Sequence, residues 1–186
     1  MKIARLLVRL IVGGLFVGHG TQKLFGWFGG HGIKGTGQFF ESLGMRPGHH
    51  HATAAGVAET TGGALLITGF ATPVAAAMLT ATMLTAINRV HLKNGPWASD
   101  GGYEYNLVLI AIVLVLAEEG PGSLALGGEK LRGPGWALAA LAGGVGGAVG
   151  AHLYAESQAE PEPAMPAQQA AAAAAAAAPD VAQPAG

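Results

Sequence analysis

The sequence contains no cysteine and few charged residues. Of its 186 residues only 11% are Asp, Glu, Lys or Arg, whereas 51% are hydrophobic. Without cysteine the chain forms no disulfide, performs no thiol exchange and holds no Cys-based zinc or iron–sulfur centre. Soluble domains carry roughly 25% charged residues, so this composition indicates a protein that lies in a bilayer, with membrane lipid as its surroundings.

Positive charge is scarce and dispersed. The ten Lys and Arg residues are scattered along the chain, and the formal net charge is −1. A protein that binds nucleic acid presents a basic surface to the phosphates, so nucleic acid is not expected as a partner.

Five apolar segments are separated by loops rich in glycine and other turn-forming residues. Each is near the roughly 20 residues that cross a bilayer core as a helix. Strand-like alternation is absent, and an open sheet in lipid would leave backbone groups unpaired. We therefore predict an all-α, polytopic membrane helical bundle, with four core transmembrane helices in residues 1–124 and a loop and fifth transmembrane helix in 125–154. The predicted spans cover about residues 6–25, 52–71, 72–90, 103–117 and 134–153.

Two shorter segments complete the predicted organisation. Between the first two spans, Thr36 is expected to cap a short helix that carries Phe39 and Phe40 and ends before Pro47; its aromatic residues are typical of the membrane interface. Residues 155–186 are rich in Pro and Ala, include an alanine run over 170–178, and are predicted to form a disordered tail.

The orientation in the membrane is predicted from the first helix. The first span follows a basic start and lacks a cleavage motif, so we expect it to stay attached. The compact charges around the first helix favour a cytoplasmic N-terminus, although the total number of Lys and Arg residues on the two sides is equal. The two sets are Lys2, Arg5, Arg9, Lys130 and Arg132 on one side, and Lys23, Lys34, Arg46, Arg89 and Lys93 on the other.

Several ionisable residues interrupt the apolar spans. Such a group at membrane depth costs roughly 2.5 to 3.5 kcal/mol even on lenient insertion scales, so it is a functional or structural candidate. Because successive spans are antiparallel, the ends of spans one and three and the starts of spans two and four share one membrane face. The resulting polar cluster is predicted to contain His19, Lys23, Glu59, Asn88, Arg89, Glu104 and Asn106.

Two interpretations of this cluster stay open. Glu59 lies on the order of 10 Å inside its span, at a depth compatible with Lys23 and His19, and an ion pair with either is the simplest arrangement. Gly56 and Gly63 flank Glu59 at spacings that let another helix approach closely. The cluster either binds a ligand or proton, or holds the bundle together. For Arg89 and Glu104, which lie nearer the interface, snorkelling is the alternative explanation.

Other motif-like strings carry less weight. Residues 30–35 fit G-x-G-x-x-G without the strand that a dinucleotide site requires. The adjacent histidines His49, His50 and His51 diverge on a helix and are expected to be solvated at the interface; haem ligation by His19 and His91 is geometrically allowed, but lone histidines usually make polar contacts. We predict no metal centre and no covalently bound cofactor.

The last span carries a stripe of small residues. Ala139, Gly143, Gly147 and Ala151 recur every four residues, and Gly146 and Gly150 form a second pair. Such stripes permit close helix packing, either within the subunit or in a homo-oligomer.

Many separate motifs occur in an order that resembles the DoxX family, over about residues 5–124. They include His19-Gly20-Thr21-Gln22-Lys23-Leu24, the following Gly-Trp-Phe-Gly-Gly loop, Ala58-Glu59-Thr60-Thr61-Gly62-Gly63, and Gly102-Tyr103-Glu104-Tyr105-Asn106. The sequence departs from the family pattern at Ala125, where Asp is common, and by adding the fifth apolar segment. The resemblance implies a four-helix protein of the prokaryotic cytoplasmic membrane.

The resemblance also implies a function. Family members are associated with a thiosulfate:quinone oxidoreductase and with a membrane oxidoreductase complex that includes a superoxide dismutase and a sulfurtransferase. We therefore expect a membrane subunit that supports an oxidoreductase complex, is not catalytic alone, and has quinone as a candidate cofactor. The alternatives are a transport or binding protein, in which Glu59, His19 and Lys23 line a route for a small solute or proton, and a scaffold without a ligand.

Overall fold

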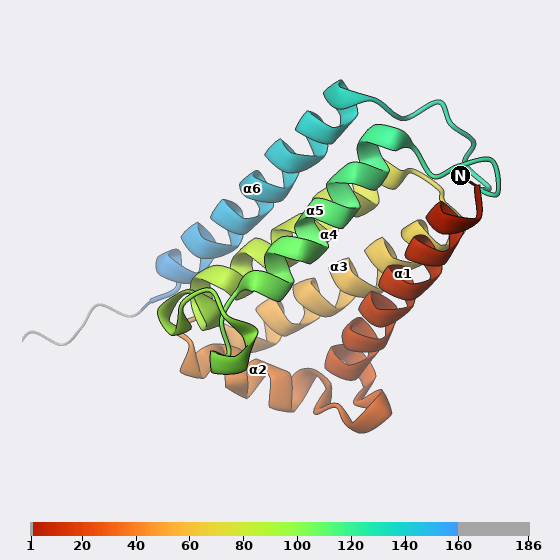
Figure 1. Ribbon diagram of the computed structural model, residues 1–186. Helices are drawn as coiled ribbons and strands as arrows, with labels where there is room; N and C mark the ends of the chain where they lie inside the picture. The colour runs from red at the N-terminus through yellow and green to blue at the C-terminus, as the bar shows by residue number, and fades with distance from the viewer. Residues whose placement is uncertain (1, 160–186) are drawn as a thin grey trace, which may run out of the picture.

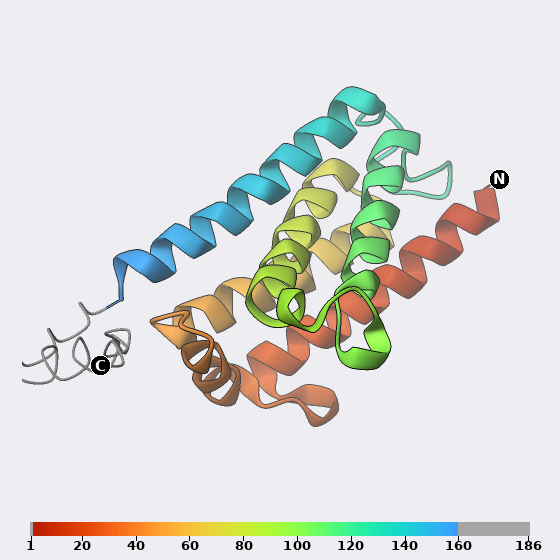
Figure 2. The ribbon, with the colours of Figure 1, turned by 60° about the vertical axis from the view of Figure 1, so that its left-hand side comes forward.

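The computed structural model describes residues 2–159, and within them every regular element is a helix, as predicted. Five long helices lie side by side, and the shorter α2 crosses one end of the bundle (Figures 1 and 2). The helices are α1 (Lys2–Phe25), α2 (Gly32–Ser42), α3 (Gly48–Thr68), α4 (Thr72–Ala86), α5 (Glu104–Glu119) and α6 (Pro134–Ser157). The predicted tail lies largely outside the described residues.

A π-helical turn, η2 (Ile87–His91), extends α4 and is followed by a short 3₁₀ turn, η3 (Leu92–Asn94). Two further 3₁₀ turns, η1 (Trp27–Gly29) and η4 (Ala98–Asp100), lie in the loops. The π-helical turn was not predicted. It carries Asn88 and Arg89, two members of the predicted polar cluster.

Two predicted helix starts are wrong. Helix α2 begins at Gly32 rather than after Thr36, because the chain turns at once after the loop and the backbone N–H of Gly35 already bonds to the carbonyl of His31. Helix α3 begins at Gly48, four residues before the predicted start at 52, because the extended backbone of Pro47 provides its N-cap. The three adjacent histidines therefore form the first turn of α3.

Within residues 2–159, three helical segments are long and apolar enough to cross a membrane: Ile3–Phe25, Thr72–Asn94 and Pro134–Ser157. Helix α5 has 16 residues, about 24 Å, which is shorter than the roughly 30 Å of a bilayer core. Helix α3 is long enough, but Glu59 and its histidines make it more polar. The number of five crossings remains a prediction, whereas the membrane helical bundle itself is confirmed.

Helix α3 tolerates its polar residues because other helices cover it. Helix α1 packs against α3 so closely that a Cβ atom on Gly20 would lie 2.6 Å from the backbone nitrogen of Thr60 and 2.7 Å from the carbonyl oxygen of Gly56. A Cβ atom on Gly63 would lie 2.6 Å from the carbonyl oxygen of Gly13. The predicted close approach beside Glu59 is confirmed.

Small residues also bring α6 against α4. A Cβ atom on Gly144 would lie 2.5 Å from Cγ2 of Thr80, and one on Gly147 would lie 2.9 Å from Cβ of Ala81. Beside Gly146 and Gly150, by contrast, nothing lies within 4 Å. The Gly147 stripe thus packs within the subunit, and the second pair faces away from the bundle.

Arg9 closes the end of the bundle opposite α2. Its side chain is 1% exposed. The guanidinium donates hydrogen bonds to the carbonyl oxygens of Leu66 at 2.8 Å and Ile67 at 2.7 Å, in the last turn of α3, and to those of Pro121 at 2.8 Å and Leu124 at 3.0 Å. Carbonyls at a helix C-terminus have no partner within the helix. Arg9, considered in the sequence only as a charge that sets orientation, therefore ties α1 to α3 and to the loop before α6.

Candidate ligand cavity

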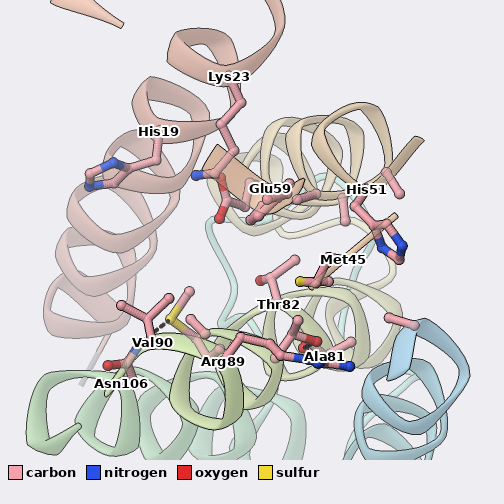
Figure 3. A pocket seen from close by; sticks show the side chains of 18 of the residues that line it. His19, Lys23, Met45, His51, Glu59, Ala81, Thr82, Arg89, Val90 and Asn106 are labelled. Atoms are coloured by element: carbon pink, nitrogen blue, oxygen red, sulfur yellow. Dashed lines mark hydrogen bonds and ion pairs between the residues drawn. The ribbon is translucent and has the colours of Figure 1, made fainter. Parts of the chain in front are cut away.

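A cavity of about 530 Å³ lies among the helix ends on the α2 side of the bundle. Each of the six α-helices contributes to its wall, which is mostly apolar: Leu15, Phe16, Phe39, Phe40, Leu43, Met45, Ala58, Met83, Val90 and Leu109 are among its residues. Its polar residues are His19, Lys23, His51, Glu59, Thr82, Thr85, Arg89, His91, Tyr105 and Asn106. Figure 3 shows several of them around the hollow.

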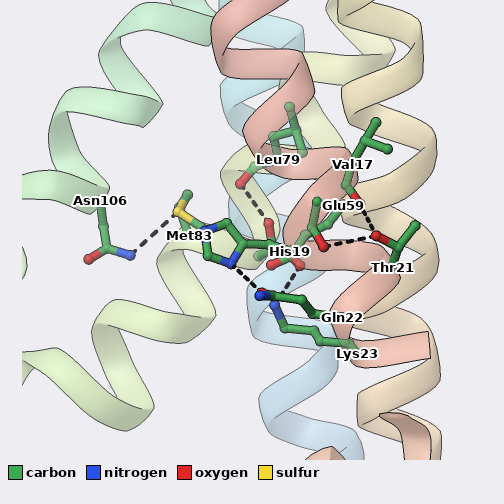
Figure 4. A network of polar contacts seen from close by, with 11 residues as sticks. Val17, His19, Thr21, Gln22, Lys23, Glu59, Leu79, Met83 and Asn106 are labelled. Carbon is green, nitrogen blue, oxygen red and sulfur yellow. Dashed lines mark hydrogen bonds and ion pairs between the residues drawn. The ribbon is translucent and has the colours of Figure 1, made fainter. Parts of the chain in front are cut away.

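Lys23 and Glu59 form the ion pair that the sequence predicted. The ammonium nitrogen of Lys23 lies 2.6 Å from Oε2 of Glu59, joining the end of α1 to the middle of α3 (Figures 3 and 4). The carboxylate side chain is 6% exposed and the lysine side chain 24%. Burial in a poorly polarisable surrounding makes such a pair strong, but each partner then depends on the other.

His19 lies one helical turn before Lys23 and also lines the cavity. It does not pair with Glu59. Its Nδ1 atom lies 3.1 Å from Oε1 of Gln22, on the same helix (Figure 4). The imidazole is mostly exposed, so its outer nitrogen is available to a molecule in the cavity or to water.

Asn106 reaches the cavity from the first turn of α5. The side chain is buried, and its amide nitrogen donates to the sulfur of Met83 at 3.4 Å (Figure 4). A thioether sulfur is a weak acceptor. This amide therefore has hydrogen-bonding capacity that the surrounding helices use poorly.

Arg89 lines the cavity from the π-helical turn, and its side chain extends toward α6 (Figure 3). Its Nη2 atom lies 2.5 Å from Nδ1 of His152 on α6. The other ring nitrogen of His152 lies 3.2 Å from Oε1 of Glu156. Because an arginine only donates, Nδ1 of His152 is the acceptor in this contact, and Nε2 faces Glu156.

Two predicted members of the cluster lie outside the cavity. Asn88 is exposed and faces the groove between α4 and α6. Glu104 begins α5, where its Oε1 atom accepts a hydrogen bond from the backbone N–H of Ala98 at 2.7 Å. The antiparallel order of the helices decides the membrane face on which a residue lies but not its direction around the helix axis. The five other predicted residues do line one cavity.

His51 was missed. We expected all three adjacent histidines to be solvated, and His49 and His50 are exposed, but His51 is 5% exposed and lies on the cavity wall. Its ring centroid is 5.5 Å from that of Tyr154 on α6, and its Nε2 atom has no hydrogen-bond partner among residues 2–159. Consecutive helical residues point about 100° apart, so one of three faces inward.

In the described part of the chain, no three His, Asp or Glu side chains converge to hold a metal ion.

The cavity thus combines apolar walls with hydrogen-bond donors and a buried ion pair. Such a site suits an amphipathic molecule with a polar head. The fold and the cavity define a class: a multi-pass helical membrane protein with a mixed polar and apolar cavity at one end of the bundle.

Comparisons with known proteins assign the family. A family model described as DoxX matches residues 4–92, a range that contains His19, Lys23, Glu59 and Arg89. The chain is similar to a Bacillus subtilis (strain 168) protein named "Putative oxidoreductase CatD", with 35% identity over 115 residues that cover 62% of this chain and 79% of the relative. No solved structure matches the chain. The protein belongs to the DoxX family.

Proposed function

We propose that this protein is a membrane subunit that binds a quinone in the cavity and supports an oxidoreductase whose electron-donating groups are carried by partner proteins. The observation that carries the proposal is the buried Lys23–Glu59 pair in the wall of an otherwise mostly apolar cavity. A quinone ring is apolar on both faces and has two carbonyl oxygens that accept hydrogen bonds. The ammonium of Lys23 and the amide of Asn106 are donors on opposite sides of this cavity.

The chemistry of quinone reduction fits these groups. A quinone takes up two electrons and two protons to become a quinol. Glu59, Lys23 and His19 can exchange protons with solvent near the end of the bundle, and hydrogen bonds to the quinone oxygens favour the reduced form as charge develops there. A chain without cysteine has no thiol of its own to oxidise, and in this proposal the electrons come from a partner protein. The oxidation of two partner thiols to a disulfide would release the two electrons and two protons required.

The relative's printed name supports an oxidoreductase setting. The proposed location is the prokaryotic cytoplasmic membrane with the N-terminus inside. A superoxide dismutase and a sulfurtransferase are the proposed partners. Purification of the full-length chain from native membranes, followed by identification of co-purifying proteins, tests these partners directly.

Quinone binding to the purified full-length protein tests the cavity. A short-chain quinone such as decylubiquinone should raise the unfolding temperature in detergent. Glu59→Gln, which removes the carboxylate charge, and Ala58→Phe, which fills the cavity, should each weaken binding at least tenfold. Ala64→Phe is the matched control, because Ala64 lies on the same helix, is exposed and does not line the cavity.

The wild-type protein alone can overturn the proposal. If neither a ubiquinone nor a menaquinone analogue shifts its unfolding temperature, the cavity is not a quinone site. Equal losses in Ala58→Phe and Ala64→Phe would place the bound quinone elsewhere, on the lipid-facing surface.

A further inference from the structure

A second hollow, of about 370 Å³, lies on the outer side of the bundle between α6 and the end of α4. The polar residues of its lining are Thr85, Asn88, Arg89 and His152. The apolar residues include Leu84, Ile87 and Val149. Val149 is 49% exposed, so the groove opens to the surroundings of the bundle rather than into its core.

The polar and apolar parts are ordered along the helix axes. His152 follows Val149 by three residues, about 4.5 Å along α6, and Asn88 follows Leu84 by four residues, about 6 Å along α4. Both polar ends point toward the end of the bundle at which α2 lies (Figure 1). Apart from Leu92, which follows Arg89, and Thr85, which follows Leu84, the groove is polar near the membrane surface and apolar toward the membrane interior, which is the polarity of a phospholipid.

Arg89 brings a positive charge to the polar end, and the carboxylate of Glu156 lies behind His152, 3.2 Å from Nε2 of that ring. No carboxylate of residues 2–159 lies within 4.0 Å of the Arg89 guanidinium, whose partner across the groove is the ring of His152. A guanidinium has five N–H donors in a planar fork that matches phosphate oxygens, and one contact to His152 leaves most of them for another acceptor. The side-chain amide of Asn88, on the exposed side of the same turn, adds further donors.

We propose that this groove binds an anionic phospholipid. Its phosphate group lies against Arg89 and Asn88, and one acyl chain runs along Leu84, Ile87 and Val149. Zwitterionic lipid has the same chains and a phosphate, but its headgroup carries a compensating cation, so Arg89, which has no carboxylate of residues 2–159 within 4.0 Å, prefers the anionic lipid. The bound lipid bridges α4 and α6 and thereby stabilises the position of α6 on the cavity wall. Arg89 lines both this groove and the larger cavity, so the lipid measurements are made without quinone.

Thermal unfolding of the full-length protein in detergent tests the proposal with two lipids of identical chains. Dioleoyl phosphatidylglycerol should raise the unfolding temperature by about 5 °C or more when saturating, and dioleoyl phosphatidylcholine by clearly less. Arg89→Gln should remove the difference between the lipids. The matched control is Arg46→Gln, because Arg46 is exposed in the loop before α3 and lies outside the groove.

A second variant tests the chain-binding part without touching the charge. Val149→Trp fills the apolar half of the groove and should abolish the phosphatidylglycerol shift. Val115→Trp, at a residue of α5 that is 56% exposed and outside the groove, should keep it.

The comparison of the two lipids on the wild-type protein tests the proposal even if a variant fails to fold. Equal shifts from the two lipids overturn the proposal. So does a full shift from glycerol phosphate alone, which would mean a free phosphate site, or an equal loss in Arg46→Gln, which would mean diffuse attraction. Retention of the shift in Val149→Trp would overturn the placement of the acyl chain, and dimerisation through this face without lipid would assign the groove to a second copy.

Discussion

Lys23 and Glu59 are joined across α1 and α3 by a contact of 2.6 Å in which the carboxylate is the more deeply buried partner. The lysine side chain retains 24% of its exposure and the glutamate side chain 6%. A lysine can extend toward the membrane surface when its partner is lost, whereas a carboxylate on a short stem cannot. The two residues are therefore unequal in what their removal leaves behind.

We expect Lys23→Met to destabilise the protein by about 3 kcal/mol, since it leaves a buried carboxylate without its cation. Glu59→Gln should cost about 1 kcal/mol, because Lys23 can reach solvent. Equilibrium unfolding of the detergent-solubilised variants measures both. The double variant should be more stable than Lys23→Met alone, and a larger cost for Glu59→Gln would contradict the burial argument.

Arg9 should not be replaceable by lysine. A lysine has three donors on one nitrogen and cannot span carbonyls of α3 and of the loop at 121–124 together, whereas Arg9 bonds to four of them. We expect Arg9→Lys to cost about 3 kcal/mol in the same unfolding assay. Arg132→Lys is the control, because its pair with Glu129 is exposed and should contribute little. Similar stability of the two variants would mean that the carbonyl contacts of Arg9 are unimportant.

Gly20 should be intolerant of any side chain. Gly20→Ala places its methyl group against backbone atoms of α3, which cannot move without shifting the helix, and should cost about 2 kcal/mol or more. Gly18→Ala, two residues earlier on α1, meets nothing within 4 Å and should leave stability unchanged or raise it slightly. The difference between the unfolding free energies of the two variants measures how closely α1 and α3 approach. Equal values would refute the close packing of these helices.

The same comparison applies to α6. Gly144→Ala would press against the branched side chain of Thr80 and should weaken the α4–α6 contact, which exposes α6 to limited proteolysis at its ends. Gly146→Ala faces away from the bundle and should have no such effect. If Gly146→Ala instead shifts the mass of the detergent-solubilised particle, that face is an oligomer contact.

The apolar segments of the sequence were enough to predict that the five long helices exist and roughly where they begin and end. The length of an apolar segment can be read from that segment alone. Helix starts were less predictable. Thr36 looks like an N-cap, yet α2 starts at Gly32, since the geometry of the preceding loop decided where the first turn closed. The early start of α3 likewise turned three histidines into a first helical turn, of which only His51 faces inward.

The part of the candidate site that depends on the antiparallel order of the helices was predictable from the sequence. Five of the seven predicted residues line one cavity, because helices that alternate in direction must place those segments at one end. Asn88 and Glu104 share that end but point elsewhere, and rotation about a helix axis is set by packing with neighbouring helices. The π-helical turn further alters the direction of every residue that it carries.

By itself, the sequence determined that this protein is an all-helical membrane protein of the DoxX family and that Glu59 needs a cation near it, because burying polar groups in lipid is costly wherever they occur. Only the tertiary structure decided which partner that was. It pairs Glu59 with Lys23 rather than with His19, places the guanidinium of Arg9 against the last carbonyls of α3 and the loop before α6, and brings His152 to Arg89. Such pairings depend on the relative rotation and crossing of whole helices, which no segment encodes alone.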